Sequence, residues 1–575
     1  MRPPTWLFGT TIFLGAFLIF LVQPMLGKAL LPWFGGASSV WITCLFFFQA
    51  ALFAEYVYAH LCQSRLSLRG QAAAQAVLLL LGLALGALPM APALHWKPDL
   101  AAHPLLRILM LLAATVGAPY LVLSTTSPLL QAWLSRVSGG RATYRFFALS
   151  NAGSLLGLAA YPFVVEPLLD LRQQAWSWSA AYLAYTLLFA ACAHRTWRAA
   201  PARQSSEPRP SGQRPDNRTR GLWLLLSGCG SLMLLAATNH LCQEVLSVPL
   251  AWVALLALYL ISFILCFGWP RCYVRGLWPV LAAAVAVSVY PDLVPGGIGT
   301  AGLFLSHAAT LLCVCMVFHG ELVRKTPAPE HLTEFYLFVA AGGALGGAAT
   351  GLAVPVLSDS VLEWPIALAA GLLASVSVLS FSVERACAWL AEKARWPPRW
   401  TAWSLRGLRL ILAGSVLCAG TAGVLIIVAW RYYDASRSVE QVRTFYGVLA
   451  VTEQDKDEPS LHRRTLRHGG IIHGQQVLAP DRRGLPTTYY TGPSGISRAM
   501  RRLQERRRRL RVGVVGLGVG TLASFARPGD AYVFYEIDSE IERLARRHFT
   551  YLSDAAERGA QCSVVLGDAR LSLER

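Results

Sequence analysis

The residues best suited to chemistry form a short stretch near the C-terminal end, VGVVGLGVGTLASFARPGDAYVFYEID over 512–538. An apolar run precedes three spaced glycines, Gly516, Gly518 and Gly520. Glycine suits such a turn because the backbone must bend sharply and approach a ligand closely, with amide N–H groups facing it. The pattern predicts a buried parallel strand over 512–515, a ligand-binding turn, and a helix that starts over 521–526.

Acidic residues follow at the tips of the next two predicted strands. Glu536 comes after an apolar run, 20 residues beyond Gly516, where a carboxylate can accept both ribose hydroxyls of a nucleoside. Asp538 follows closely, and Asp568 comes after a third apolar run, where an aspartate can accept from an adenine amino group. This order of strands, glycines and acids predicts a nucleoside-binding α/β fold. The alternative, that the glycines serve only tight packing, is the weaker interpretation.

The elements that would carry this site follow a much longer apolar region. Of the 575 residues, 55% are hydrophobic and only 14% are charged. Soluble domains carry about 25% charged residues, so the composition is that of a membrane protein. Arg-rich loops that set topology explain the net charge of +19 better than nucleic acid does. We therefore expect the lipid bilayer as a partner, no nucleic acid, and no metal, because the cysteines lack zinc-ligand spacing.

Apolar runs of about 20 residues, enough to cross a bilayer as helices, occur about 12–13 times in the sequence. Six of these runs precede a linker rich in Pro, Ser and Arg, six more follow it, and one extra run comes last. The predicted division is a first six-helix half over 1–193, a flexible basic linker over 194–221, a second six-helix half over 222–383, a basic segment with an extra transmembrane helix over 384–430, a small β-hairpin region over 431–495, and a Rossmann-like nucleoside-binding domain over 496–575.

A short internal repeat supports the division into two halves. AGSLLGLAA at 152–160 and AGGALGGAA at 341–349 agree at six of nine positions, and each lies in the fifth helix of its half. Small residues four apart let two helix backbones approach closely. We therefore expect both segments to lie at helix contacts, in a parallel duplication of the kind found in major-facilitator folds.

The loop charges predict an orientation that conflicts with cofactor supply. Lys and Arg concentrate in the loops after even-numbered helices, which places the N-terminus in the cytoplasm. A thirteenth crossing then places the residues after 431 outside. A nucleoside cofactor is made inside the cell, so its supply favours a cytoplasmic C-terminal domain on the inner membrane of a bacterium.

Polar side chains within the apolar runs are further candidates, because ionisable groups are costly inside a membrane. Asn239, His240, Glu244 and Glu334 are the predicted transport residues, with helix ends and interfacial water as the alternative explanation. The wider set comprises Gln23, Lys28, Glu55, Asn151, Glu166, His307, His319 and Glu321.

Segments of both parts resemble bacterial membrane proteins in which a major-facilitator-like bundle is fused to a spermidine synthase-like domain. The matching segments are LVQPM at 21–25, SNAGSL at 150–155, TNH at 238–240, HLTEFY at 331–336, LRHGG at 466–470, PTTYY at 486–490, GLGVGT at 516–521, YEID at 535–538 and GDAR at 567–570. The resemblance implies a multi-pass helical bundle joined to a Rossmann-like α/β domain.

The same resemblance implies aminopropyl transfer from decarboxylated S-adenosylmethionine to the polyamine precursor putrescine, without a metal. Glu536 would then hold the ribose, Asp568 would lie near the adenine, and Gln476 and Tyr490 would contact the substrate. Val519 stands where that family carries an Asp in the glycine turn. Its proton-accepting Asp is expected beyond Arg575, so we expect an incomplete domain, a third strand at an exposed edge, and no assignable catalytic residue.

Two other functions fit the same residues. The first is a transporter of polyamines or related cations, with the nucleoside-binding domain as a sensor. The second is an S-adenosylmethionine-dependent methyltransferase that shares the predicted cofactor pocket. The sequence predicts no oligomeric state.

Overall fold

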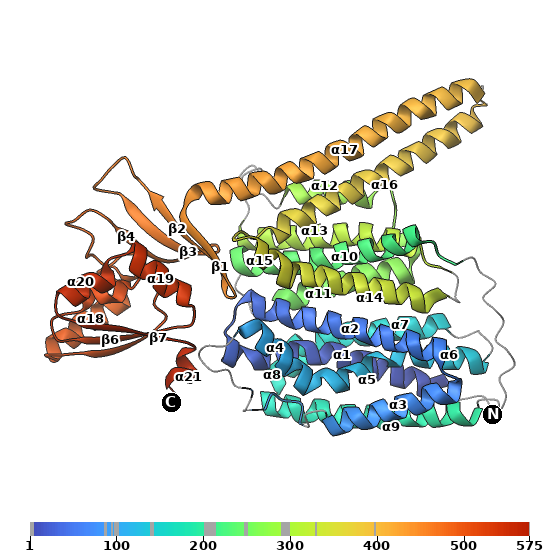
Figure 1. The fold of residues 1–575 in the computed structure, drawn as a ribbon, viewed down its shortest axis with the longest axis horizontal. Helices are drawn as coiled ribbons and strands as arrows, with labels where there is room; N and C mark the ends of the chain where they lie inside the picture. Colours follow the sequence, from blue (N-terminus) through green and yellow to red (C-terminus); the bar gives the residue numbers. More distant parts are fainter. Residues whose placement is uncertain are drawn as a thin grey trace.

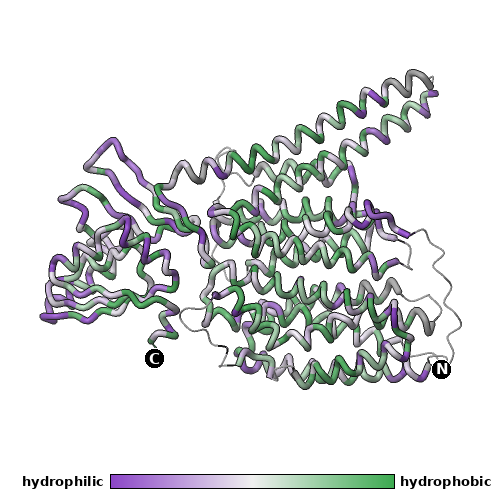
Figure 2. The backbone as a smooth tube through the Cα atoms, in the orientation of Figure 1, coloured by the Kyte–Doolittle hydropathy of each residue, from purple (hydrophilic) through white to green (hydrophobic). Residues whose placement is uncertain are grey.

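A helical bundle with a small α/β region at one end forms the computed structural model (Figure 1). The structure describes residues 5–85, 89–93, 96, 103–138, 143–199, 214–245, 251–288, 299–327, 331–395 and 398–573. Figure 2 shows that the bundle is mostly apolar along its length, whereas hydrophilic residues dominate the α/β region. Helices suit this setting because backbone polar groups in lipid must be paired within the segment itself.

The first part of the bundle is drawn in blue and cyan in the lower half of Figure 1. Its elements are α1 (Thr5–Phe34), α2 (Ser38–Arg65), α3 (Leu68–Leu85), α4 (Pro104–Leu112), η2 (Ala113–Gly117), α5 (Ala118–Ser124), α6 (Thr126–Ser138), α7 (Thr143–Ala160), η3 (Tyr161–Val165), α8 (Glu166–Leu168) and α9 (Leu171–Ala199).

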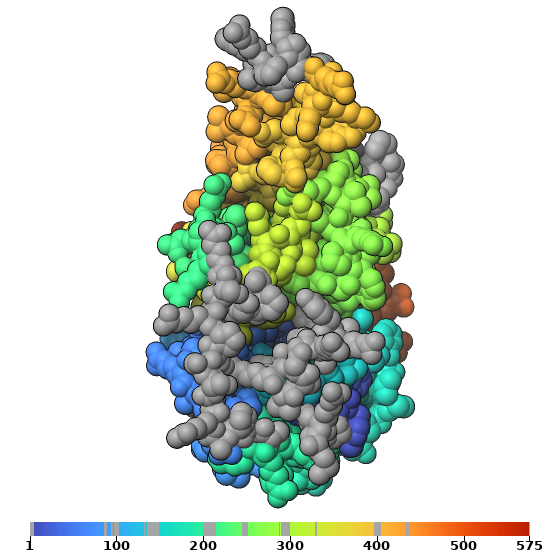
Figure 3. Space-filling view, turned by 90° about the vertical axis from the view of Figure 1, so that its right-hand side faces the viewer, coloured from blue at the N-terminus to red at the C-terminus, as the bar shows by residue number. Residues whose placement is uncertain are grey.

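The second part, drawn in green and yellow, lies against the first. Its elements are α10 (Asn217–His240), η4 (Leu241–Val245), α11 (Ala251–Gly268), η5 (Pro270–Cys272), α12 (Trp278–Val287), α13 (Thr300–Val323), α14 (Leu332–Ala348), η8 (Ala349–Ala353), α15 (Val354–Leu357), α16 (Glu363–Lys393) and α17 (Pro398–Arg437). Figure 3 looks onto the end of the bundle that lies away from the α/β region, with the first part below the second and the orange α17 near the top.

The chain is a multi-pass helical membrane protein, as predicted. In the part of the chain that the structure describes, nine helices are long and apolar enough to cross a membrane. Helices α3, α7, α9 and α12 lie among them in the bundle. The lipid bilayer is therefore the surrounding partner of this region.

The repeated small-residue motif lies at helix contacts, which confirms that prediction. A Cβ on Gly153 of α7 would meet the backbone oxygen of Phe13 on α1 at 2.6 Å. A Cβ on Gly346 of α14 would meet the backbone oxygen of Gly228 on α10 at 2.4 Å. In each half, the motif helix therefore packs backbone to backbone against the first helix. Both motif helices then continue into a π-helical turn, η3 or η8.

The α/β region contains two sheets that share one hydrophobic core. The first sheet is antiparallel with the order β1 (Ser438–Thr444), β2 (Gly447–Gln454), β3 (Arg463–His468) and β4 (Ile471–Val477). The second is parallel, with the order β5 (Arg511–Val515), β6 (Ala531–Glu536) and β7 (Gln561–Leu566). The helical elements are η9 (Thr488–Tyr490), α18 (Gly495–Arg506), η10 (Thr521–Phe525), α19 (Ser539–His548), α20 (Tyr551–Glu557) and α21 (Ala569–Leu573).

Two local predictions for this region are wrong. Strand β5 is not buried on both faces, because Val515 is 74% exposed on the side of the sheet that carries no packed helix. The helix expected after the glycine turn is only the short 3-10 segment η10.

The α/β region docks on the bundle through a few polar contacts. The Arg443 guanidinium pairs with Glu363 at the start of α16, and their side chains are 6% and 0% exposed. Arg443 also donates to the backbone oxygen of Ser360 at 2.9 Å. The backbone N–H of Gly470 donates to the backbone oxygen of Gln243 in η4, just after α10. These contacts hold the first sheet against one end of the bundle, which we call the docking end.

The basic loops lie at the opposite end of the bundle, beside the N-terminus (Figure 1). Among the described residues this end, the basic end, carries Arg65, Arg69, Arg271, Arg275, Arg324, Lys325 and Lys393. The docking end carries fewer basic residues, Lys28, Arg107 and Arg172, beside the acids Glu166, Asp170, Asp359 and Glu363. Lys and Arg are enriched on the cytoplasmic side of membrane proteins.

We expect the basic end to face the cytoplasm and the α/β region to lie outside it, contrary to the expectation from cofactor supply. A fluorescent protein that matures only in the cytoplasm and an alkaline phosphatase that is active only outside would be fused after Leu573. The phosphatase fusion should be active and the fluorescent fusion dark. The reverse pattern would place the α/β region inside the cell.

Removing one partner of the buried docking pair should loosen the α/β region. Arg443→Met leaves the Glu363 carboxylate buried without its cation, which costs about 3–5 kcal/mol in comparable pairs. We expect faster proteolysis within β1–β4 and a lower thermal midpoint in detergent. Arg482→Met, which removes an exposed guanidinium of the same region, is the matched control. Equal behaviour of the two variants would show that the pair contributes nothing to docking.

Candidate functional site

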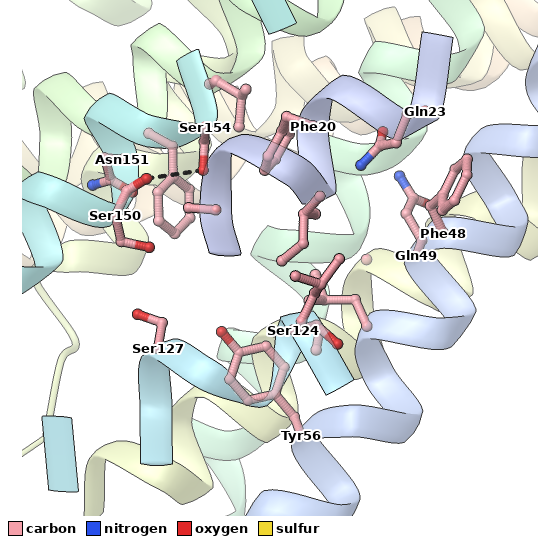
Figure 4. A pocket seen from close by; sticks show the side chains of 18 of the residues that line it. Phe20, Gln23, Phe48, Gln49, Tyr56, Ser124, Ser127, Ser150, Asn151 and Ser154 are labelled. Carbon is pink, nitrogen blue, oxygen red and sulfur yellow. Dashed lines mark hydrogen bonds between the residues drawn. The ribbon is translucent and has the colours of Figure 1, made fainter. Parts of the chain in front are cut away.

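A cavity of about 290 Å³ lies inside the bundle between its two halves. Figure 4 shows polar side chains of α1, α2, α5, α6 and α7 around it, with a hydrogen bond from Ser154 to the backbone oxygen of Ser150. We call it the central cavity. Its polar and aromatic lining comprises Phe20, Gln23, Phe48, Gln49, Tyr56, Tyr120, Ser124, Thr126, Ser127, Ser150, Asn151, Ser154, Tyr259, Phe263 and Tyr336.

The central cavity is suited to an uncharged or aromatic solute. Its described lining includes no Lys, Arg, Asp or Glu. Rings from both halves meet at the wall, where Tyr56 and Tyr336 stack with centroids 5.9 Å apart. Hydroxyl and amide groups at apolar walls are what small-molecule sites use to fix orientation. Glu55, one residue from Tyr56 on α2, is fully buried, and neither carboxylate oxygen has a hydrogen-bond partner among the described residues.

A second cavity, of about 400 Å³, lies where the α/β region meets the docking end. We call it the interface pocket. One wall belongs to the bundle and contains Gly35, Gly36, Ala37, Ser38, Trp41, Cys242 and Gln243. The other belongs to the α/β region and contains Tyr446, His468, Ile471, His473, Gly516, Gly518, Glu536, Ile537, Asp538 and Ile541. The glycine turn therefore faces the membrane part of the same chain.

The three glycines of the turn have different surroundings. All have a positive φ, between 56° and 88°. A Cβ on Gly516 would meet nothing within 4 Å, so this residue opens onto the pocket. A Cβ on Gly518 would meet the backbone oxygen of His473 at 2.5 Å, and one on Gly520 would meet Leu552 at 3.1 Å. Gly516 thus leaves space for a ligand, while the other two allow close packing.

The two acids of the motif lie together in the interface pocket. Glu536 is 4% exposed and accepts from the backbone N–H of Leu517 at 2.8 Å and of Asp538 at 3.0 Å. Asp538 accepts from the Thr444 hydroxyl of the β1–β2 hairpin. Burial raises the pKa of both carboxyl groups. Burial and the nearby carboxylates raise the pKa of Tyr446 to about 12.

The other predicted residues of the α/β region lie outside the interface pocket. Asp568 accepts from the backbone N–H of Leu571 and begins α21. The Gln476 side-chain amide donates to the Thr550 hydroxyl and accepts from the Thr550 backbone N–H. It therefore fixes β4 against the start of α20. The Tyr490 ring contacts that of Tyr489 in a tilted arrangement, with centroids 4.5 Å apart. Val519 packs against Gly474, 1% exposed, on the side of the turn away from the pocket.

Three of the four predicted transport residues do not line the central cavity. Asn239 accepts from Ser38 at 3.0 Å, nearer the docking end. His240 is buried and lies parallel to Trp364 with ring centroids 5.4 Å apart. Glu334 pairs with Arg220 at the basic end. The side chain of Glu244 lies outside the described residues. Gln23 and Asn151, from the wider set of polar residues, do line the cavity.

Sequence reasoning missed most of the residues that form these two cavities. Tyr56, Tyr336 and Trp41 look like ordinary apolar-run residues, since aromatic side chains are common in membrane helices. His468 and His473 lie on either side of the Gly469–Gly470 turn between β3 and β4, and their spacing carries no pattern that predicts ligand contact. A usable signal was the Ser150–Asn151 pair inside the small-residue motif, because polar residues at a close helix contact need a partner or a cavity. Within the described chain no group of three or more His, Cys, Asp or Glu is placed to hold a metal ion.

The fold and its cavities define the class of an integral, multi-pass helical membrane protein with a small C-terminal α/β region. No family model and no curated protein matches the chain. Among solved structures, a mutant of the peptide transporter POT is 13% identical and covers 66% of this chain and 94% of its own, with a TM-score of 0.43. A POT family transporter in complex with 5-aminolevulinic acid is 12% identical and covers 65% and 96%, with a TM-score of 0.42. Similarities of this size carry no conclusion about function.

Nucleoside binding in the interface pocket should weaken as the pH falls. A ribose in this pocket would hydrogen-bond to the ionised Glu536 carboxylate, and the raised pKa means that this group takes up a proton at a higher pH than an ordinary glutamate. The stability of the fold changes with pH in the opposite direction. The stabilisation from protonated Glu536 is complete below the ordinary pKa of a glutamate and is lost as the pH rises through the raised pKa of the folded state. Calorimetry with 5′-methylthioadenosine over a pH series measures the effect.

Glu536→Gln should weaken this binding at neutral pH by roughly 10- to 100-fold, since hydrogen bonds to charged groups contribute about 1.5–3 kcal/mol. It should also flatten the pH profile. Glu557→Gln, an exposed acid on α20, is the control and should change neither. Unchanged affinity in Glu536→Gln would remove this residue from the site.

Proposed function

We propose that the protein is a membrane transporter of small polar organic solutes, with a nucleoside-binding α/β domain docked on one end. The observation that carries the proposal is the central cavity, which lies between two halves built on the same helix contact. Substrate sites of transporters with internal repeats lie near the middle of the membrane, between the repeats. The polar lining of the central cavity lies at the corresponding position, between the two halves.

The chemistry of the lining narrows the cargo. A polyamine carries several positive charges and calls for carboxylates, but the described lining of the cavity contains none. Glu334, a predicted carboxylate for such a cargo, is already paired with Arg220. Tyrosine rings, amides and hydroxyls instead suit a solute with a flat apolar face and a few hydrogen-bonding groups. Polyamines therefore become the less favoured cargo.

Transport would be tested by counterflow into proteoliposomes with a panel of labelled amines, amino acids and nucleosides. Asn151→Ala should reduce the uptake of the transported solute roughly tenfold, since a lost hydrogen bond in a desolvated site costs about 1–3 kcal/mol. Gln173→Ala removes the same amide from the exposed surface of α9 and should transport like the wild type. No saturable uptake of any solute in the panel would refute the transporter proposal.

A second candidate is aminopropyl transfer, favoured by the acidic lining of the interface pocket. Glu536 and Asp538 line this pocket, and its described walls contain no Lys or Arg. Such walls suit the sulfonium of decarboxylated S-adenosylmethionine. The putrescine amine would attack the methylene beside the sulfur, the carbon–sulfur bond would break to release methylthioadenosine, and a pocket base would take the amine proton. Methyl transfer from S-adenosylmethionine would use the same pocket.

Aminopropyl transfer and methyl transfer can be separated by isotopic labelling. The full chain is incubated with putrescine and with decarboxylated S-adenosylmethionine that carries the label in its aminopropyl group. Labelled spermidine that disappears in Glu536→Gln would establish aminopropyl transfer. Label from the S-methyl group of S-adenosylmethionine in a product would indicate methyl transfer. Binding without either product would leave the α/β domain as a ligand-binding domain of the transporter.

A further inference from the structure

The central cavity and the interface pocket lie in line along the bundle. On α2, Trp41 lines the interface pocket and Leu45 lines the central cavity. They are four positions apart along the helix, about 6 Å at a rise of about 1.5 Å per residue. Leu234 on α10 lines the central cavity, and Cys242 just beyond that helix lines the interface pocket. A thin layer of side chains therefore separates the two cavities.

This layer holds the two halves of the bundle together. The Ser38 hydroxyl, from the first half, donates to the Asn239 amide oxygen at 3.0 Å. The Gln243 amide donates to Ser38 at 3.1 Å and to Asn239 at 2.6 Å. Beside them, Trp41 and Trp252 contact each other across the halves, with ring centroids 5.3 Å apart. We call these five residues the gate layer, because the halves cannot part here without breaking their contacts.

The two cavities also share a ligand chemistry. Each is lined by aromatic rings and by neutral hydrogen-bonding groups, and neither has a Lys or Arg in its described walls. A phosphate group would find no cation in either cavity. A nucleoside without phosphate could stack its base on the rings and hydrogen-bond through its ribose. Only the interface pocket adds carboxylates, so it would hold such a ligand more tightly.

We propose that the bundle delivers its cargo to the α/β domain: a phosphate-free nucleoside crosses the gate layer from the central cavity and binds in the interface pocket. Glu536 then holds the ribose, while Ser38, Trp41 and Gln243 form the bundle's side of the same site. This inference rests on the transport function proposed above. It also removes the conflict between orientation and supply, since a nucleoside made in the cytoplasm reaches a domain on the far side.

The bundle's share of the site is tested by binding of 5′-methylthioadenosine to the full chain in nanodiscs. Trp41→Ala should lower the affinity roughly tenfold, since a base loses its stacking partner. Trp269→Ala removes an exposed indole at the basic end and should bind normally. Equal affinities in the two variants would show that the bundle does not contact the ligand.

Delivery through the gate layer is tested by locking it. Ser38→Cys combined with Asn239→Cys places two thiols where side-chain atoms are now 3.0 Å apart, so oxidation can join the halves. The chain is reconstituted in liposomes, and external protease removes the α/β domain from molecules that expose it. Photoreactive 8-azidoadenosine is then added outside, at the basic end of the protected molecules.

Under reducing conditions, the probe should label peptides of both the central cavity and the interface pocket. Oxidation should abolish labelling of the interface pocket and spare that of the central cavity. Probe loaded into the lumen should label the interface pocket in both states, which shows that the locked protein is folded. Ser38→Cys alone, which can pair only with a native thiol such as Cys242, identifies any unintended cross-link.

The possible failures are distinguishable. Labelling of the interface pocket that persists after oxidation would overturn delivery through the gate layer. Uptake of an amine or amino acid without any labelling by the nucleoside probe would also overturn delivery, while leaving the transporter proposal standing. No uptake of any solute would refute the transporter proposal and, with it, this one.

Discussion

Each half of the bundle depends on a glycine-mediated contact between two helix backbones. Between α1 and α7, and again between α10 and α14, the repeated motif leaves no room for a side chain. Lipid supplies no hydrophobic force between helices, so close packing of this kind has to hold them. The helices of a half are therefore fixed relative to one another. The central cavity lies at the boundary between the halves.

The same boundary continues to the docking end, where the chain adds a polar layer and then a second domain. The gate layer uses neutral hydrogen bonds, whereas the docking contact uses a buried ion pair, Arg443 with Glu363. Neutral hydrogen bonds are individually weak and can be exchanged, but a buried charge that loses its partner is strongly unfavourable. The two layers therefore differ in strength: the halves can separate at the gate layer more readily than the α/β domain can leave Glu363.

The sequence predicted the membrane class, the position of the α/β region and the contacts of the small-residue motif, because each rests on a local pattern. The conformation of the glycine turn was also predictable, since Gly516 needs a positive φ. The partners of these elements could not be predicted. Gln476 braces a helix and Glu334 pairs with Arg220, and both facts depend on segments distant in sequence. The interface pocket was hidden for the same reason, because even Gln243 and Tyr446, on its two walls, are 203 residues apart in sequence.

Helix α17 runs into β1 without a break, since it ends at Arg437 and the strand begins at Ser438. Only 11% of the most apolar stretch of this helix is buried inside the protein, so α17 acts mainly as a tether through lipid. A rigid tether keeps the α/β domain at a high effective concentration beside its docking surface, in the millimolar range or above for short connections. Docking therefore needs little intrinsic affinity. When the buried docking pair does open, the tether keeps the domain beside its docking surface, so the pair can re-form without the diffusional search that two separate chains would need.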